Sequence, residues 1–294
     1  MAGASHSLRR LAGRRRAMRD SRADARLQPT LQRGEAGTLL LSPHLDDAVL
    51  DCWGELASEE PVRVVNLFAG VPPAGTVVPM WDRITGASDS AARMRERLTE
   101  DASALALAGR EPLNLPLLDA QYPGQGGRPG PEELDRELAT RLAGQSFSRV
   151  LAPAGIGGHP DHVLARRYAR VLARAGFAVA LYAELPYCVA HGWPGWVDGR
   201  GDDPFRDVDP FWSSFLAGVT ELGALRAARV VRLDDAAAAA KLAAMRCYRS
   251  QLPALTAGAR GLLEDPEIHR YEVSWQLGVH TGSSASRQGG HRDG

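Results

Sequence analysis

The sequence is poor in cysteine, in net charge and in long apolar segments, and each shortage excludes a class of protein. Three cysteines, Cys52, Cys188 and Cys247, occur without a Cys-x-x-Cys pair, so neither a disulfide framework nor a cysteine zinc site is expected. No apolar run is long enough to span a bilayer, and the Arg-rich start lacks the apolar stretch of a signal peptide. We therefore expect a cytoplasmic protein without a membrane span.

The charges balance in sum but not along the chain. The 35 basic groups offset 35 acidic groups, which argues against a dedicated nucleic-acid binder. Residues 1–36 nevertheless hold nine arginines against three acidic groups, a net charge of +6, and residues 281–294 carry +1, which leaves −7 for the segment between them. We expect a basic disordered tail at 1–36, one domain at 37–280 and a second disordered tail at 281–294. The first tail could also contact nucleic acid or a membrane, or act in organelle targeting. Lys241 is, however, the only lysine in the chain. This preference for arginine is typical of GC-rich coding, which produces Arg-rich tails by composition alone.

From Gly37 onward, short apolar runs alternate with segments of helical periodicity. Residues 38–41 and 62–68 are predicted as buried strands, with helically spaced apolar residues between them. Further strands are expected at 113–118, 150–152, 177–183 and 230–233, and helices at 87–107, 131–142, 161–175 and 234–249. Residues 186–210 are rich in Trp, Gly, Pro and Asp and suggest a long loop or lid. The alternation predicts a single α/β domain with a mostly parallel sheet.

Two histidine-containing segments follow expected strands, at the end of a parallel sheet where ligands bind. Ser-Pro-His44-Leu-Asp46-Asp47 follows the first strand, and Gly-Gly-His159-Pro-Asp-His162 follows the strand at 150–152. Zinc with one open position takes three protein ligands, and His44, Asp47 and His162 can provide two imidazoles and a carboxylate. Asp46 is then placed to act as a general base, and His159 to donate to the oxygen that becomes negative when a carbonyl is attacked.

Either segment alone is also explained as a helix N-cap with acidic first-turn residues. Two of them after separate strands of one sheet are better explained by a metal site. The same ligands can also hold Fe²⁺ for oxygen chemistry, and a sugar- or nucleotide-binding protein without turnover is a further alternative. The glycines at 155–158 do not predict a phosphate loop, because no Lys-Ser or Lys-Thr pair follows them.

These segments resemble the two motifs of the PIG-L/LmbE-like zinc-dependent N-deacetylases, the first of which is usually written HPDDE or HPDDA. The resemblance covers roughly residues 37–255 and includes Arg97-Leu-Thr-Glu100 followed by Gly109, Asp119 after Leu117-Leu118, and the segment from Lys241 to Arg249-Ser250-Gln251. This sequence departs from the family pattern at three positions. Leu45 replaces the usual Pro, Ala48 replaces a frequent Glu, and Tyr248 stands where the family often has His. The missing carboxylate at Ala48 weakens the match to the branches that act on thiol cofactors and glycosylphosphatidylinositol.

The resemblance implies a Rossmann-like, mostly parallel sheet with helices on both faces, in which the first and fourth strands are neighbours. It implies one Zn²⁺ per chain held by residues matching His44, Asp47 and His162. It also implies a base matching Asp46 and an oxyanion-stabilising histidine matching His159. Arg97 and Asp119 are the expected substrate contacts. The implied reaction is hydrolysis of an N-acyl group, most often acetyl, from an amino sugar or sugar conjugate.

Two further sets of residues have alternative interpretations. Arg97 and Glu100 either serve the substrate site or form an exposed ion pair on a helix. Glu184, Tyr187, Trp193 and Trp196 either line a sugar-binding rim, because flat aromatic faces suit pyranose rings, or pin the long loop to the core.

Overall fold

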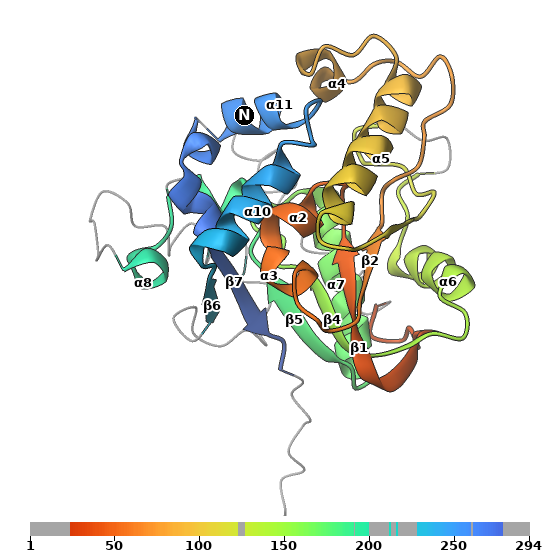
Figure 1. Ribbon diagram of the computed structural model, residues 1–294. Coiled ribbons are helices and arrows are strands. Elements are labelled where there is room, and N and C mark those ends of the chain that lie inside the picture. Colours follow the sequence, from red (N-terminus) through yellow and green to blue (C-terminus); the bar gives the residue numbers. More distant parts are fainter. Residues whose placement is uncertain are drawn as a thin grey trace, which may run out of the picture.

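The computed structural model describes residues 24–122, 127–190, 192–199, 228–259 and 261–278, together with residues 212 and 216. Within this part of the chain, one sheet has the strand order β3-β2-β1-β4-β5-β7-β6 (Figure 1). Its strands are β1 (Gln32–Ser42), β2 (Val62–Asn66), β3 (Pro112–Asn114), β4 (Ser146–Pro153), β5 (Ala178–Tyr182), β6 (Arg229–Arg232) and β7 (Tyr271–Gln276). The strands from β3 to β5 pair in parallel, whereas β7 pairs antiparallel with both β5 and β6. The prediction of a single, mostly parallel α/β domain is confirmed.

The central strands are apolar on both faces because helices cover both sides of the sheet. Leu39, Leu40 and Leu41 are successive residues of β1 and all three are fully buried, as is typical of a strand in the middle of a parallel sheet. In Figure 1, α2, α3 and α10 lie in front of the strands and α7 lies behind them. Right-handed crossovers require this division, because the chain moves from β1 to β2 in one direction and from β4 to β5 in the other.

The helices begin and end largely where the sequence signals them. They are α2 (Asp47–Asp51), α3 (Trp53–Leu56), α4 (Met80–Ile84), α5 (Ser90–Ala106), α6 (Pro131–Arg141), α7 (Pro160–Arg174), α8 (Gly195–Asp198), α10 (Asp235–Met245) and α11 (Leu252–Gly258), with 3-10 turns η1 (Tyr187–Val189), η3 (Leu262–Glu264) and η4 (Pro266–Arg270). The side chains of Asp89 and Asp234 cap α5 and α10 by accepting the N–H groups of Ala91 and Ala237. No helix in the described ranges is long and apolar enough to cross a membrane.

The direction of sheet growth reverses between β1 and β4, which lie side by side. In a parallel sheet, the loops after two such strands diverge and leave a crevice at the carboxyl edge. The two histidine segments follow β1 and β4, so the fold brings them to this one crevice, as expected.

Ordered structure begins before the boundary expected at Gly37. Residues 32–35 belong to β1, whose Gln32 pairs with Ser146 of β4. Ahead of the strand, Thr30 donates its backbone N–H and its hydroxyl to Asp135 of α6, and Asp24 forms a two-bond ion pair with Arg167 of α7. The acidic partner Asp135 on α6 and the basic partner Arg167 on α7 hold this segment against the domain. Residues 1–23 and 279–294 lie outside the described part of the chain.

Two other features of the fold add detail to the expectations from the sequence. The antiparallel strand β7 was not anticipated, although Tyr271, Val273 and Trp275 alternate with polar residues as in a half-buried strand. The segment 186–210, expected to be a long loop or lid, contains the short η1 and α8 in its described part, while residues 191 and 200–210 lie outside it.

Candidate metal centre

The loop after β1 is folded into a tight turn that presents His44 and Asp47 on one side. The Ser42 hydroxyl donates to the His44 carbonyl oxygen (2.6 Å) and accepts the Ala48 N–H (3.1 Å). The backbone N–H of His44 donates to Oδ2 of Asp47 (2.7 Å), which fixes that carboxylate beside the imidazole. The turn leads directly into α2, with Asp46 at its N-cap position and Asp47 as its first residue.

The side-chain atoms of His44, Asp47 and His162 form a nearly equilateral triangle. Nδ1 of His44 lies 3.5 Å from Oδ2 of Asp47, Nε2 of His162 lies 3.5 Å from the same oxygen, and the two nitrogens are 3.2 Å apart. Donors that sit about 2.0–2.1 Å from a tetrahedral ion are separated by about 3.3–3.4 Å. The triangle therefore fits one face of the coordination tetrahedron of a divalent ion, and the fourth position is left for another ligand.

The other ring nitrogen of each of these histidines faces a carboxylate. Nε2 of His44 lies 3.2 Å from Oδ2 of Asp161, and Nδ1 of His162 lies 3.2 Å from Oε1 of Glu184. Asp161 is itself held by the Ala120 N–H (2.9 Å), and the fully buried Glu184 accepts the N–H groups of Gly155 and Ile156. Such partners orient metal-binding imidazoles and fix their tautomers.

Sequence reasoning missed this role of Glu184 and Asp161. Glu184 comes two residues after β5, which pairs with β4. The rule that polar residues beyond neighbouring parallel strands meet at one edge would have pointed to it.

His159 lies beside the triangle and has a different partner. Its ring stands edge-on to His44 at 4.7 Å between centroids, and ligand atoms of His44, His159 and His162 all lie within 4.8 Å of one another. A second possible set, within the same limit, is His44, Asp119, His159 and Asp161. Nδ1 of His159, however, accepts the Asp161 N–H (3.4 Å) as the N-cap of α7. This contact favours the tautomer with hydrogen on Nε2, which makes the imidazole a donor.

The site is built to hold positive charge. Burial would lower the pKa of His44, but the carboxylates of Asp119, Asp161 and Asp47 outweigh it and raise that pKa to about 10. Burial and the adjacent Asp47 raise the pKa of Asp46 to about 6. Burial and the neighbouring imidazoles lower the pKa of His159 to about 4. The carboxylates thus create a negative potential that a divalent cation would offset.

Of the two expected substrate contacts, Asp119 lies beside the triangle, and Arg97 is close enough to lower the pKa of Asp46 and of Asp119 by its charge. Oδ2 of Asp119 lies 3.9 Å from Nε2 of His44, and its carboxylate accepts the backbone and side-chain N–H groups of Gln121 (2.9 and 3.0 Å). Arg97 is only 3% exposed, and its Nη2 lies 3.3 Å from Oδ1 of the fully buried Asp82 on α4. Asp82 also accepts the Tyr122 hydroxyl (3.0 Å). Arg97 is thus held in place by α4, a partner that the sequence did not suggest.

An exposed Arg97–Glu100 pair is not formed, and that interpretation is wrong. Both side chains are buried, and Glu100 accepts the backbone N–H (2.8 Å) and the hydroxyl (2.7 Å) of Ser250. Lys241, at the other end of the segment that resembles the family, is fully buried and pairs with Glu272 (3.0 Å). The late segment therefore braces the domain instead of reaching the triangle.

The aromatic residues after β5 divide into two groups. Trp193 is buried, donates its indole N–H to the Ile268 carbonyl oxygen (2.9 Å) and packs edge-on against Trp212, so it pins this region to the core as one interpretation predicted. Trp196 packs on Trp212 as well. The ring of Tyr187, by contrast, stands 5.6 Å from that of His162 and 6.5 Å from that of His159. Tyr187 is thus the member of the set that borders the triangle.

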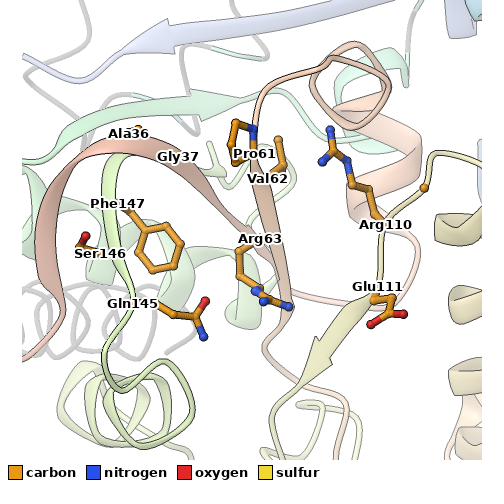
Figure 2. Close-up of a pocket in the computed structure, with 11 residues that line it drawn as sticks. Ala36, Gly37, Pro61, Val62, Arg63, Arg110, Glu111, Gln145, Ser146 and Phe147 are labelled. Atoms are coloured by element: carbon orange, nitrogen blue, oxygen red, sulfur yellow. The ribbon is translucent and has the colours of Figure 1, made fainter.

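A cavity of about 610 Å³ lies at the opposite end of the sheet (Figure 2). Its lining comes from the middle of β1, from the amino ends of β2 and β4 and from residues 109–111 before β3, and it includes Arg63, Gln145 and Phe147, whose side chains are drawn in Figure 2. Ligands of parallel sheets bind beyond the carboxyl ends of the strands. The cavity is therefore separate from the metal centre, which remains the best candidate for chemistry.

Comparison with known proteins gives related enzymes for this chain. It is 30% identical over 202 residues to 2'-N-acetylparomamine deacetylase of Streptomyces fradiae, a match that covers 63% of this chain and 71% of that protein. The crystal structure of the A40926 pseudoaglycone deacetylase Dbv21 matches 82% of this chain and 98% of its own with a TM-score of 0.61 at 25% identity. The zinc-inhibited form of the teicoplanin deacetylase Orf2 matches 84% of this chain and 100% of its own with a TM-score of 0.64 at 24% identity. No protein-family model matches the sequence.

Proposed function

The chain belongs to the PIG-L/LmbE-type N-deacetylases, hydrolases that act on amide bonds, and we propose that it removes the acetyl group from an amino sugar within a glycoside. The observation that carries the proposal is the triangle of His44, Asp47 and His162, with donor atoms 3.2–3.5 Å apart. We propose Zn²⁺ as the ion, because two imidazoles and one carboxylate with a fourth position open form a common catalytic zinc site.

A divalent ion, when bound there, supplies a Lewis acid that polarises the amide carbonyl and makes water a stronger nucleophile at neutral pH. The protein residues around it do the remaining work. Asp161 and Glu184 hold the two imidazoles in orientation through their far nitrogens. Burial of the site keeps these carboxylate contacts strong, because little water competes with them.

Asp46 is the proposed general base. It lies beside the ligand Asp47 yet caps no backbone group of α2, so its carboxylate is free to take a proton from the attacking water. The same carboxyl group then delivers that proton to the nitrogen as the C–N bond breaks, releasing acetate and a free amine. A base whose pKa lies near neutral is suited to both transfers.

His159 is the proposed stabiliser of the oxyanion. With Nδ1 occupied by the Asp161 N–H, Nε2 carries the hydrogen that can be donated to the oxygen of the tetrahedral intermediate. A donor already aimed at the developing charge lowers the barrier without reorganising during the reaction. Arg97 and Asp119 are proposed to contact the sugar.

The relatives support an amino-sugar glycoside as substrate. One is named for an N-acetylated paromamine, and the structural neighbours are named as a deacetylase of the A40926 pseudoaglycone and a deacetylase of the teicoplanin biosynthetic pathway. The exposed apolar side chains of Val77, Met80 and Ile84 around α4 support a substrate with an apolar part. Asp82 of the same helix binds Arg97, which places α4 next to the residues proposed to contact the sugar.

The test is a screen of N-acetylated amino sugars, aminoglycosides and glycopeptides for release of free amine, with and without a chelator. We expect release from at least one glycoside class, its loss with the chelator and its recovery with added Zn²⁺. Failure on every amide by zinc-loaded protein would favour a binding protein instead. Stoichiometric iron in protein purified without added metal, together with oxygen consumption, would contradict the hydrolase.

A further inference from the structure

Asp51 is a buried carboxyl group with no part in the chemistry described above. It is the last residue of α2 and only 4% exposed. Its Oδ1 accepts the backbone N–H of Leu185 at 2.8 Å, across 134 residues of sequence. Its Oδ2 has no hydrogen-bond partner among the described residues. Burying a carboxyl oxygen without a partner costs free energy, so Asp51 is not explained by stability alone.

The position of Asp51 on α2 relates it to the metal centre. Asp47 and Asp51 are four residues apart, so their side chains lie on the same face of the helix. Asp47 points to the triangle with His44 and His162. One turn later, Asp51 points to the strand end that carries Leu185.

Leu185 directly follows Glu184, the carboxylate that faces His162. Glu184 accepts the N–H groups of Gly155 and Ile156 as well as contacting Nδ1 of His162. The position of the Glu184 carboxylate therefore depends on where the carboxyl end of β5 lies relative to the loop before α7. The Asp51–Leu185 hydrogen bond ties that β5 end to α2.

We propose that Asp51 is a positioning residue for the metal centre, which sets His162 relative to Asp47 by fixing the Glu184–Leu185 segment to α2. The contacts form a closed path: Asp47 and Asp51 share one helix, Asp51 holds Leu185, Glu184 orients His162, and His162 meets Asp47 in the triangle. The proposal rests on the metal site of the proposed function but not on the identity of the substrate.

The charge of Asp51 fits a role as an uncharged acceptor. Burial, together with the nearby negative charge of Asp47 and Glu184, raises the pKa of Asp51 well above its usual value against the opposing effect of the Leu185 hydrogen bond. A neutral carboxyl group at Asp51 adds no further negative charge near the proposed ligands His44, Asp47 and His162. Asn, which keeps an acceptor oxygen in the same place, should therefore replace Asp51 faithfully.

The experiment measures the Zn²⁺ dissociation constant of the full chain by competition with a chromophoric chelator, and the Tm of the metal-free protein. Asp51→Asn should bind Zn²⁺ within about threefold of the wild type, whereas Asp51→Leu should weaken binding by about 10- to 100-fold, the usual effect of losing an outer partner of a ligand. Asp51→Ser, which is too short to reach Leu185, should behave like Asp51→Leu and serves if the leucine variant does not fold.

Asp135→Leu is the matched control. Asp135 is also 4% exposed and accepts a backbone N–H, that of Thr30 at 3.0 Å, but its hydrogen-bond partners, Thr30 and Tyr168, do not include Glu184 or any residue of the triangle. We expect Asp135→Leu to lower the Tm of the metal-free protein without changing the Zn²⁺ dissociation constant. In a Glu184→Ala background, Asp51→Leu should weaken Zn²⁺ binding by less than about threefold, because the two residues act in one path.

Three results would overturn the proposal. The first is that Asp51→Leu or Asp51→Ser lowers the Tm but binds Zn²⁺ as tightly as the wild type does. Asp51 would then only stabilise the fold. The second is that Asp51→Asn binds Zn²⁺ as weakly as Asp51→Leu does. The third is that Asp51→Leu weakens Zn²⁺ binding in the Glu184→Ala background by the same factor as in the wild type. Wild-type protein that does not bind Zn²⁺ would overturn the proposed metal centre and this proposal together, whereas zinc binding without amide hydrolysis would refute only the proposed reaction.

Discussion

The same isosteric change, Asp to Asn, should remove turnover at both Asp46 and Asp47 but should remove bound Zn²⁺ only at Asp47. Asp46→Asn removes the proposed base but no capping hydrogen bond of α2, so we expect a folded protein that still binds Zn²⁺. Loss of a general base costs roughly 10²–10⁴ in rate. At about 1.4 kcal/mol for each factor of ten, the barrier should rise by about 3–5 kcal/mol.

Asp47→Asn changes a proposed ligand. Oδ2 of Asp47 lies 3.5 Å from the donor nitrogens of both His44 and His162 and accepts the His44 N–H at 2.7 Å. A neutral amide there removes the charge that offsets the cation. We expect Zn²⁺ binding to weaken by more than the roughly 10- to 100-fold loss that is usual for residues behind the ligands.

The assay compares amine release at saturating substrate with zinc content after dialysis, for the wild type and both variants. Reasoning from the geometry requires Asp46→Asn to keep one zinc per chain with little turnover, and Asp47→Asn to lose both unless Zn²⁺ is in excess. Loss of zinc from Asp46→Asn in proportion to its activity would refute this division of roles. So would an Asp46→Asn enzyme that keeps more than about a tenth of the wild-type kcat.

Two predictions concern stability. His269 donates Nε2–H to the Leu263 carbonyl oxygen, and its Nδ1 has no partner in the described part of the chain; burial lowers its pKa to about 4. The unfolded chain therefore binds more protons below pH 6.5, and this group should remove about 3 kcal/mol of stability between pH 6.5 and 4. His269→Gln should flatten that part of the profile in urea unfolding, and parallel profiles would contradict the assignment. Lys241→Met should destabilise by about 3–5 kcal/mol because it leaves Glu272 without its buried cation. The control is Arg229→Ala, which removes an ion pair between Glu55 and an arginine side chain that is 62% exposed. This variant should lower the free energy of unfolding by less than about 1 kcal/mol. If Lys241→Met and Arg229→Ala lowered it equally, the stabilising role of the buried pair would be refuted.

The parallel core and the grouping of His44, Asp47 and His162 could be predicted because both depend on local signals. Runs such as Leu39–Leu41 identify buried strands, and a histidine segment directly after a strand must lie at the carboxyl edge of the sheet. Once the resemblance implied that the first and fourth strands are neighbours, His44 and His162 had to face the same crevice. The observed order of β1 and β4 agrees.

What could not be predicted depends on contacts between segments far apart in the sequence. Nothing near Arg97 indicates that Asp82 is its partner, and nothing near Asp51 indicates Leu185. Residues 24–36 give little local signal of order, because they are mostly polar and because their partners Asp135 and Arg167 lie on two later helices. Side-chain pairs of this kind follow from the assembled fold and leave no local periodicity.

The insertion of β7 between β5 and β6 has a consequence for the order in which the sheet is completed during synthesis. β5 is made on the order of 90 residues before its partner β7, and the Val273 carbonyl oxygen accepts the N–H of Ala183 (2.8 Å), next to Glu184. Until residues 271–276 leave the ribosome, the β5 edge beside Glu184 is unpaired and open to association with other chains. We therefore expect the chain beside Glu184 to gain its last strand partner late in the synthesis of this protein.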